Sequence, residues 1–565
     1  MKRKLDIIYT SDTHGHVFPV DYPAGKQEDS GILNMAHQIR RNKNTLILDG
    51  GDTLQGTPLS QYYIAHSSEY PYHPMAEAFN ALGCDYFTLG NHDFNFGYEA
   101  LRDYLHAMRA ECICANVEDL RGELGIRRDA VHILDNGLRV GITGIVTDYV
   151  NVWEQPQNLA GLAVTSAFEA ARDACKRLQK SCDICICIYH GGFEEDLETG
   201  ALLSESTENI ACRIARELDF DLLLTGHQHM AVEGVWLNGT YAVQPPANAA
   251  QYIHLKIEET GIEGPEDAES EKTKELGFEE PENAGSEKTK KLGSEGSKDA
   301  GAEKMGVPGC GGEKLPGKRK PAVTSELVRV GAGHEEQPYK KLLSIERDTQ
   351  KWLDEPVGLL REKIEPEEKL EAALYGSRLA DLFNEVQLDA SGADFSCTSL
   401  GNCPVGLEKK VTMRDICGAY LFANTLVVLE VDAAALRAAL ERCASYFVLK
   451  QGTPQISAEF LKPKVEHYNY DFYAGLDYEF DLTRPVGQRV VKMVRPDGSP
   501  LLPDRKYRLV TSNYRATGTG GYEALGRCRV LWRGAAEVPE LIASYIRRNS
   551  PLKCGIRSQI AVKWQ

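Results

Sequence analysis

The sequence has no long hydrophobic run and comparatively little positive charge. No stretch approaches the roughly 18 apolar residues that span a bilayer, and the start, MKRKLDIIYTSD, has too short an apolar segment for a signal peptide. Lys and Arg number 64 against 82 Asp and Glu, a formal net charge of -18, which disfavours binding to nucleic acid backbones. We therefore expect a cytoplasmic protein with a small-molecule substrate, bound to neither nucleic acid nor membrane.

Paired cysteine motifs are also scarce. The 15 cysteines are odd in number, and most lie in apolar stretches. Cys182 and Cys185 form a CxxC, but they alternate with isoleucine in a strand pattern and no second CxxC completes a zinc site. We predict reduced, buried thiols rather than disulfides or a structural metal site.

One segment, from about Glu258 to Lys320, is almost without aromatic residues. It consists mainly of Glu, Lys, Gly, Ser and Pro and repeats itself, with SEKTKELG at 270 and SEKTKKLG at 286. Such a composition cannot bury enough apolar surface to offset its ordering entropy. We expect a disordered charged insert over residues 258–336, either a surface expansion or a docking tether.

The insert divides a chain of 565 residues, which is too long for one core. We predict an N-terminal domain over residues 1–257 and a C-terminal domain over 355–565. The helical spacing of Leu342, Ile345 and Trp352 predicts a linker helix over 337–354.

Five apolar stretches of the N-terminal region end on polar side chains, nearly all beside glycine. Amphipathic stretches such as SGILNMAHQIRRN lie between them, and this alternation predicts an α/β fold with ligands at the carboxyl ends of the strands. A single Asp-x-His or strand-end histidine is usually hydrogen-bonded structure, but five such ends together suit two divalent cations about 3.5 to 4 Å apart. His16, His37, His66 and His73 fit no such pattern and are expected to be structural or surface groups. The strand-end residues are Asp12 and His14, Asp52, Asn91 and His92, His190, and His227 and His229.

In this order the motifs resemble the calcineurin-like metallophosphoesterases, and with the linker helix and the C-terminal region the chain resembles the 5'-nucleotidase family, including its 2',3'-cyclic-nucleotide 2'-phosphodiesterase/3'-nucleotidase branch. The resemblance implies a four-layer αββα sandwich, a linker helix and a C-terminal α/β nucleotide-binding domain. It also implies a phosphoric ester hydrolase of nucleotide catabolism and salvage, although relatives are often exported.

The resemblance assigns roles by motif. Asp12, His14 and His229 would hold one metal, and Asn91, His190 and His227 the other, with Asp52 bridging. His92 would stabilise the phosphoryl transition state or assist the leaving group. Many 5'-nucleotidases have an Asp that orients this histidine where Asn95 stands here, and an amide stabilises an imidazolium less well. Zinc, manganese, iron and cobalt all suit these ligands.

The C-terminal region bears on substrate class. FSCTSLGNCPVG stands where the 5'-nucleotidases proper resemble Asn-Gly-Gly-Gly-Ile-Arg, and the missing Arg favours the cyclic-nucleotide branch. Tyr470 and Tyr522 are expected to sandwich the base, a contact worth roughly 1 to 3 kcal/mol, with Asn513 and Arg515 as further substrate-binding residues. For Tyr470, packing along a strand remains an equal alternative.

The predicted function is a dinuclear-metal-dependent nucleotide phosphohydrolase. Three alternatives remain: a UDP-sugar hydrolase of the same family, a protein phosphatase and a non-catalytic nucleotide-binding protein. A protein phosphatase has no need of a second domain with paired aromatics, and a non-catalytic protein should have lost ligands. The sequence makes no prediction of the oligomeric state.

Overall fold

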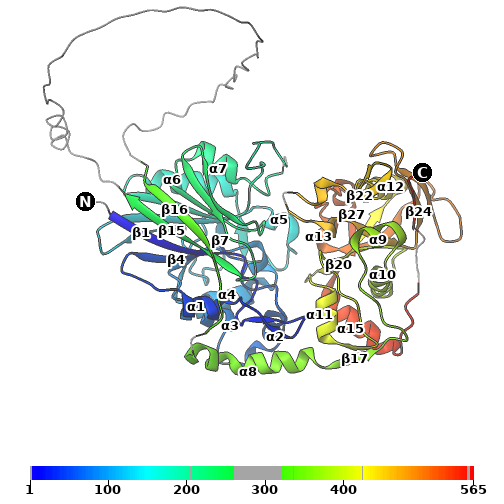
Figure 1. Cartoon of the computed structure of the whole chain (residues 1–565), viewed down its shortest axis with the longest axis horizontal. Coiled ribbons are helices and arrows are strands. Elements are labelled where there is room, and N and C mark those ends of the chain that lie inside the picture. The colour runs from blue at the N-terminus through cyan, green and yellow to red at the C-terminus, as the bar shows by residue number, and fades with distance from the viewer. Residues whose placement is uncertain are drawn as a thin grey trace, which may run out of the picture.

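The structure is a computed structural model that describes residues 3–203, 206–259, 320–334, 336–422, 424–462, 464–555 and 560–565. The N-terminal domain lies on one side, the C-terminal domain on the other, and helix α8 (Glu336–Leu353) runs along the base of the first toward the second (Figure 1). Within the described ranges, no helix combines the length and the apolar character that a membrane span requires.

Two six-stranded sheets form the centre of the N-terminal domain. The first has the order β16-β15-β1-β4-β5-β6 and the second the order β13-β14-β12-β11-β9-β8. Strands β1, β4, β5 and β6 run parallel, as do β9, β11, β12 and β14, so several carboxyl ends meet at one edge of each sheet. The strands are β1 Arg3–Thr10, β4 Thr45–Asp49, β5 Tyr86–Phe87, β6 Glu111–Cys112, β8 Asp129–Ile133, β9 Arg139–Val146, β11 Ile184–His190, β12 Leu222–Thr225, β13 Val232–Leu237, β14 Thr240–Gln244, β15 Gln251–Glu259 and β16 Ala322–Arg329.

The sheets pack face to face, with helices on both outer faces. One buried cluster joins Ile7 and Leu46 of the first sheet to Ile142, Ile186 and Leu224 of the second. Separate clusters place α1–α4 against the first sheet, and α6 and α7 against the second. The predicted four-layer αββα sandwich is therefore confirmed. The remaining elements of this domain are α1 Ile32–Gln38, α2 Pro58–His66, α3 Pro74–Leu82, α4 Gly97–Ala107, α5 Val150–Trp153, α6 Ala167–Leu178, α7 Ala211–Glu217, β2 Val20–Asp21, β3 Lys26–Gln27, β7 Val117–Asp119 and β10 Leu162–Val164.

The cysteines behave as the sequence predicts. Those in the described part of the chain form no disulfide, and most are buried. Cys185 and Cys187 on β11 pack in the same cluster as Cys175 on α6. They fill a sheet–helix interface as small apolar side chains, which explains their alternation with isoleucine.

The predicted bounds of the charged insert, 258–336, are wrong at both ends. Strand β15 continues to Glu259, and β16 pairs with it antiparallel, beginning with Glu258 opposite Ala322. Val323 and Leu327 alternate along β16 and pack against the inter-sheet core, a strand signal that the charged composition around it concealed. The interior of the insert, 260–319, lies outside the described residues. Helix α8 agrees with the predicted linker helix to within one residue.

Deleting residues 262–318 is expected to leave Tm and turnover nearly unchanged. Because Glu258 and Ala322 are already paired, the residues left between the strands need only form a hairpin loop of ordinary length. Thermal unfolding and phosphate release, compared with those of the full chain, measure the effect. A folded deletion variant without activity would contradict this expectation and assign the segment a function.

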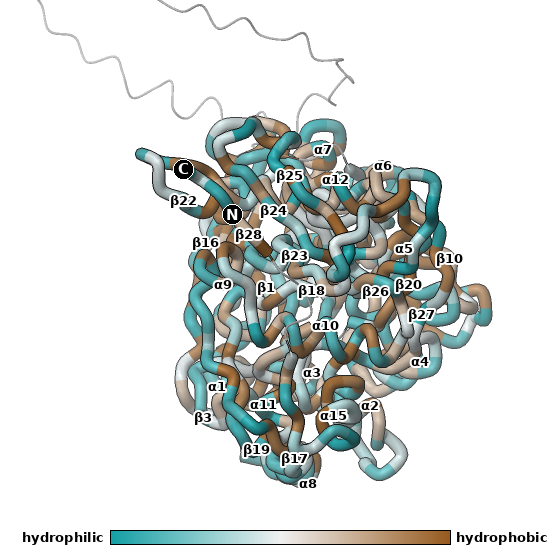
Figure 2. The backbone as a smooth tube through the Cα atoms, turned by 90° about the vertical axis from the view of Figure 1, so that its right-hand side faces the viewer, coloured by the Kyte–Doolittle hydropathy of each residue, from teal (hydrophilic) through white to brown (hydrophobic). Residues whose placement is uncertain are grey.

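The C-terminal domain is built on a five-stranded sheet of order β23-β18-β26-β20-β27. Helix α10 packs against β18 and β23, and Figure 2 shows these elements from the outside of the domain. The elements of this domain are β17 Pro356–Leu359, α9 Lys369–Tyr375, α10 Arg378–Ser391, β18 Phe395–Ser399, β19 Lys410–Thr412, α11 Met413–Ala419, β20 Thr425–Val431, α12 Ala433–Ala444, β21 Phe447–Lys450, β22 Thr453–Ile456, β23 Asp471–Ala474, β24 Asp477–Asp481, β25 Val490–Val494, β26 Tyr507–Ser512, α13 Asn513–Ala516, α14 Glu523–Gly526, β27 Arg529–Glu537, α15 Val538–Asn549 and β28 Ile560–Lys563.

The two domains contact each other through side-chain hydrogen bonds at the end of α5 and just after it. Trp153 donates its indole N–H to Thr519 Oγ1 at 3.2 Å. Gln155 donates its amide to Thr425 Oγ1 at 3.1 Å. Both N-terminal residues follow β9, one of the strands of the second sheet, so the C-terminal domain lies against the edge where the predicted site residues are found.

His73 is expected to make the fold sensitive to acid. It caps α3 and packs against Tyr63 and Tyr104, and burial lowers its pKa from 6.5 to about 3. The unfolded state therefore binds one more proton than the native state below pH 6.5, so stability falls as pH falls, by up to about 1.4 kcal/mol per pH unit from this group. His73→Asn keeps a capping side chain without the titration. Calorimetry should show a smaller loss of Tm between pH 7.5 and 5.5 in the variant, and equal losses would contradict the assignment.

Candidate metal centre

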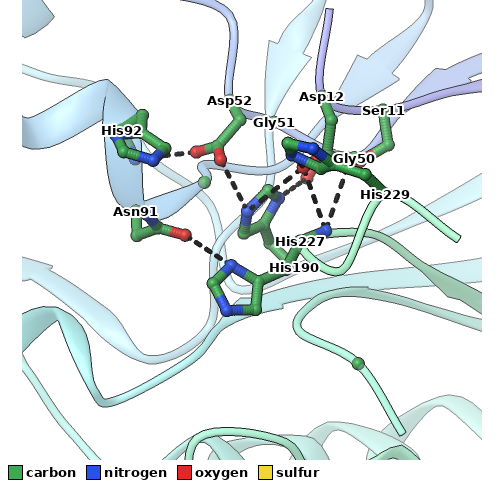
Figure 3. Close-up of polar contacts among 12 residues, drawn as sticks. Ser11, Asp12, Gly50, Gly51, Asp52, Asn91, His92, His190, His227 and His229 are labelled. Carbon is green, nitrogen blue, oxygen red and sulfur yellow. Dashed lines mark hydrogen bonds and ion pairs between the residues drawn. The ribbon is translucent and has the colours of Figure 1, made fainter. Parts of the chain in front are cut away.

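The predicted metal ligands gather at the carboxyl ends of the parallel strands, where the two sheets meet (Figure 3). Most of these residues have a left-handed backbone. This conformation costs L residues on the order of 1 to 3 kcal/mol and persists where the surroundings demand a particular side-chain direction. Its concentration in one small region indicates a functional site. The residues are Asp12 (φ 54°), His14 (φ 48°), Asp52 (φ 59°), His227 (φ 69°) and His229 (φ 56°).

The first group of donors is Asp12, His14 and His229. His14 lies with Nδ1 2.8 Å from the carbonyl oxygen of Gln55, a contact that requires a proton on Nδ1 and leaves a lone pair on Nε2. That Nε2 lies 3.0 Å from Nε2 of His229, which in turn lies 3.3 Å from Asp12 Oδ1. Burial and the neighbouring His229 lower the pKa of His14 to about 3, so the ring is neutral. These donor atoms point at a common position, as ligands of a cation do.

The second group is Asp52, His190 and His227, with Asn91 beside them. The Nδ1–H of His190 donates to the carbonyl of Gly50 at 2.6 Å, and its Nε2 has no hydrogen-bond partner in the described residues. His227 has Nε2 3.2 Å from Glu208 Oε1, which places the proton there and aims the Nδ1 lone pair at Asn91 Oδ1, 2.9 Å away. Two acceptors facing each other fit a cation between them.

The charges of the site favour a cation. Burial opposes ionisation of Asp12 and Asp52, but His190 and the other neighbouring histidines together outweigh it and lower the pKa of both carboxyls. Burial would lower the pKa of His190, yet these two carboxylates raise it to about 10. The centre therefore attracts positive charge strongly enough to hold a proton on a fully buried imidazole. Its carboxylate, imidazole and amide donors fit divalent metal ions.

Asp93 supports the centre from behind, a role that the sequence interpretation did not assign. Its carboxylate accepts four backbone N–H groups and so fixes the loop that carries Asp52. Gly90 and Gly51 are packed so closely that a Cβ on Gly90 would collide with the Asp52 carboxylate. The Asp of the Gly-Asn-His-Asp motif was the sequence feature from which this role could have been predicted. The four donors are Asp52 at 3.0 Å, Thr53 at 2.8 Å, Leu54 at 3.0 Å and Gly90 at 2.8 Å.

His92 lies beside both groups without belonging to either. Its ring is 5.5 Å from that of His14, and its backbone N–H donates to Asp52 Oδ1 at 2.7 Å. Its Nδ1 lies 2.8 Å from Asn95 Oδ1, so the structure brings the predicted His92 and Asn95 together.

The four substrate-binding residues predicted in the C-terminal domain all have structural contacts within that domain. Tyr470 and Tyr522 are only 2% and 1% exposed, and their hydroxyls donate to the carbonyls of Ala373 and Asn469. Each ring packs in the domain core, so neither presents a face to a ligand. The sequence correctly placed Tyr470 beside a strand and Tyr522 in a loop. A sequence pattern does not show whether a ring is enclosed or exposed.

Asn513 and Arg515 also have structural partners. Arg515 is buried, pairs with Asp471 at 2.8 Å and lies over the Tyr522 ring at 3.9 Å. Asn513 Oδ1 accepts the backbone N–H of Thr425 at 3.1 Å. Both side chains hold the domain together.

Three other aromatic rings lie in a row in the C-terminal domain, and the sequence interpretation missed them. Phe422 and Tyr468 lie 5.9 Å apart, and Tyr468 and Tyr514 lie 6.5 Å apart. All three are half-buried. Burial raises the pKa of Tyr468 and Tyr514, and the charge of Glu208, the partner of His227, adds to it. Tyr468 and Tyr514 therefore lie on the side of the C-terminal domain toward Glu208, and Phe422 lies next to Tyr468.

Two further residues join the site from either domain. Trp153 stacks on His227 with ring centroids 5.3 Å apart. Lys464, from the C-terminal domain, is close enough to Asp12 and Glu208 that their charges partly offset the lowering of its pKa by burial. Neither stands in a recognisable motif, so proximity in the fold was needed to find them.

Comparisons with known proteins agree with this geometry. A calcineurin-like phosphoesterase model matches residues 5–231, and a model of the 5'-nucleotidase C-terminal domain matches residues 364–527. A trifunctional nucleotide phosphoesterase of Bacillus subtilis is 25% identical over 96% of this chain, which spans 38% of that protein. The 2',3'-cyclic-nucleotide 2'-phosphodiesterase/3'-nucleotidase of Haemophilus influenzae is 25% identical over 99% of this chain and 87% of its own.

Among solved structures, a Staphylococcus aureus protein described as a 5'-nucleotidase, crystallised with alpha-ketoglutarate, has a TM-score of 0.82 and 27% identity, covering 99% of this chain and 100% of the other. The two matching family models fall on the two domains of the fold, and the metal donors lie within the first. The chain therefore joins a calcineurin-like phosphoesterase domain to a 5'-nucleotidase C-terminal domain and is a hydrolase of phosphoric ester bonds.

Proposed function

We propose that this chain hydrolyses phosphate esters of nucleotides with two divalent cations, one held by Asp12, His14 and His229 and the other by Asn91, His190 and His227, with Asp52 between them. The observation that carries the proposal is the gathering of these side chains into two adjoining groups, with Nε2 of His14 3.0 Å from Nε2 of His229 and Nδ1 of His227 2.9 Å from Oδ1 of Asn91. Zinc, manganese, iron and cobalt remain the candidate ions.

Such cations, when bound, would neutralise phosphoryl oxygens and lower the pKa of an attacking water. The chain's own residues position the metal donors and exclude water from the centre. Gln55, Gly50 and Glu208 fix the proton positions of His14, His190 and His227. Trp153 covers the His227 ring, and the C-terminal domain covers Trp153. His92, beside both donor groups, would donate a hydrogen bond to the phosphoryl group or a proton to the leaving oxygen.

The base would stack on the half-buried rings of Phe422, Tyr468 and Tyr514. Stacking on aromatic faces tolerates every base, because each base has a π-face. Lys464 adds a positive charge on the same side of the centre. This assignment takes the place of Tyr470 and Tyr522, whose rings are enclosed in the domain core.

We propose activity on 2',3'-cyclic nucleotides and 3'-nucleotides alongside 5'-nucleotides. The segment 395–406 lacks the Arg that would anchor one phosphate orientation, so a stacked base can present phosphorus on different ribose oxygens. The activities named for the Haemophilus influenzae and Bacillus subtilis relatives support this breadth.

Phosphate release from a substrate panel tests the proposal. The full chain is stripped of metal, reloaded separately with each candidate ion, and given 2',3'-cyclic AMP, 3'-AMP, 5'-AMP, UDP-glucose and a phosphopeptide. We expect hydrolysis of the three adenine nucleotides, little preference among bases, and no turnover of the phosphopeptide. Turnover of UDP-glucose alone, or of one 5'-nucleotide without cyclic activity, contradicts the proposal.

A further inference from the structure

A buried carboxylate lies behind the pair formed by His92 and Asn95. Glu154 is 8% exposed, and its Oε2 accepts the side-chain amide of Asn95 at 2.7 Å. Its Oε1 accepts the backbone N–H of Gln155 at 2.6 Å and the side-chain amide of Asn158 at 2.8 Å. Among the described residues, Glu154 makes no direct ion pair, so neutral N–H donors surround a buried negative charge.

This carboxylate determines which way the Asn95 amide points. An ionised carboxylate only accepts hydrogen bonds, so Asn95 must turn its Nδ2 toward Glu154. Its Oδ1 then faces His92, which must donate from Nδ1–H. Asn158 also donates to the backbone carbonyl of Asn95 at 2.8 Å and holds that residue in place. The Nδ1–H of His92 is thereby fixed toward Asn95, so Nε2 is the ring atom that takes up a proton and donates it to the phosphoryl group or the leaving oxygen.

We infer that Glu154 is a positioning residue for His92, acting through the side-chain amide of Asn95. The inference rests on the proposed role of His92 in phosphate ester hydrolysis. An Asp at position 95 would supply a negative charge itself. Here Glu154, 59 positions further along the chain, supplies that charge. Asn95 and Glu154 are complementary, because an Asp at position 95 would bring two carboxylates to within hydrogen-bond distance of each other.

Counting the hydrogen-bond donors and acceptors of His92, residue 95 and residue 154 gives a different expectation for each variant. In Glu154→Gln, the new amide N–H faces Asn95, whose side chain then turns its oxygen toward the glutamine and its N–H toward His92. The Nδ1 of His92 must then accept, and the proton moves to Nε2. In Asn95→Asp, two carboxylates oppose each other. In the double variant Asn95→Asp/Glu154→Gln, the glutamine amide donates to the new carboxylate, which accepts from His92 Nδ1–H, and every hydrogen bond is restored.

Steady-state kinetics of the metal-loaded full chain, with the best nucleotide of the panel, test the inference. Each single variant should lower kcat about tenfold, the size of one well-formed hydrogen bond, with KM and metal content little changed. The double variant should recover most of the lost kcat. Glu346→Gln is the matched control, since Glu346, on the distant α8, is also buried and accepts hydrogen bonds from Tyr22 and Gln350. Wild-type kcat in Glu154→Gln, or a double variant no faster than the single variants, overturns the inference.

The ¹⁵N spectrum of His92 gives a readout that does not depend on turnover. In the wild type the ring should be protonated on Nδ1, in Glu154→Gln on Nε2, and in the double variant on Nδ1 again. If no panel substrate is hydrolysed but these shifts are found, the proposed function fails while the positioning of His92 stands. Unchanged shifts in Glu154→Gln contradict the positioning role itself.

Discussion

Asp52→Ala is expected to lose both metal ions and at least about 10³-fold in kcat, since a preorganised charge is removed from the reacting centre. The Asp52 carboxylate is buried, lies 3.2 Å from His190 Nε2 and accepts the backbone N–H of His92. Without it, His190 loses the nearer of its two carboxylates, and the centre loses half of its negative charge. Metal content by mass spectrometry and kcat should therefore fall together.

Asp119→Asn provides a matched control for this variant. Asp119 also accepts backbone N–H groups, from Arg121 and Leu124, but lies outside both donor groups. It should keep both metals and a wild-type rate. An Asp52→Ala enzyme with two metals per chain and near-normal turnover would rule out the proposed position of Asp52 between the ions.

His92→Ala is expected to keep its metals and lose roughly 10²-fold or more in kcat, the scale of a general acid or an electrostatic donor. The His92 ring contributes no atom to either donor group, and its contact with Asp52 is made by the backbone, which survives the substitution. KM should change little, because the ring acts in the transition state rather than in binding the base.

Metal content separates this result from a ligand role. Loss of one metal in His92→Ala would show that the imidazole belongs to the inner coordination sphere. A normal rate with both metals present would remove His92 from the mechanism.

The strand and helix pattern was sufficient for an α/β fold, the motif resemblance implied the four-layer αββα sandwich, and the strand ends predicted the candidate metal donors, because each leaves marks at fixed places along the chain. A strand that ends on Asp12 or His190 beside glycine indicates a ligand site from its own sequence, before its neighbours in space are known. The sequence around the aromatic residues does not indicate which rings are exposed. Tyr470 and Phe422 are both aromatic residues next to strands, and only the packing of the domain shows that Tyr470 is enclosed whereas Phe422 is half-buried beside Tyr468.

Glu154 and strand β16 were missed for related reasons. Glu154 follows a four-residue helix and has no motif around it, so its link to Asn95 exists only after folding. Strand β16 follows the charged segment, where composition outweighed the alternation of Val323 and Leu327. Both are contacts between segments far apart in the sequence, which local patterns do not encode.

The hairpin of β15 and β16 leaves the first sheet at the end opposite the chemistry. Glu259 lies across from Arg3, at the start of β1, whereas the metal ligand Asp12 follows the end of that strand. A polypeptide of almost any length can therefore enter and leave here without approaching the catalytic edge. The connection between β15 and β16 is therefore an insertion site, where a reporter domain or an affinity module can be placed in the enzyme while both termini remain unaltered.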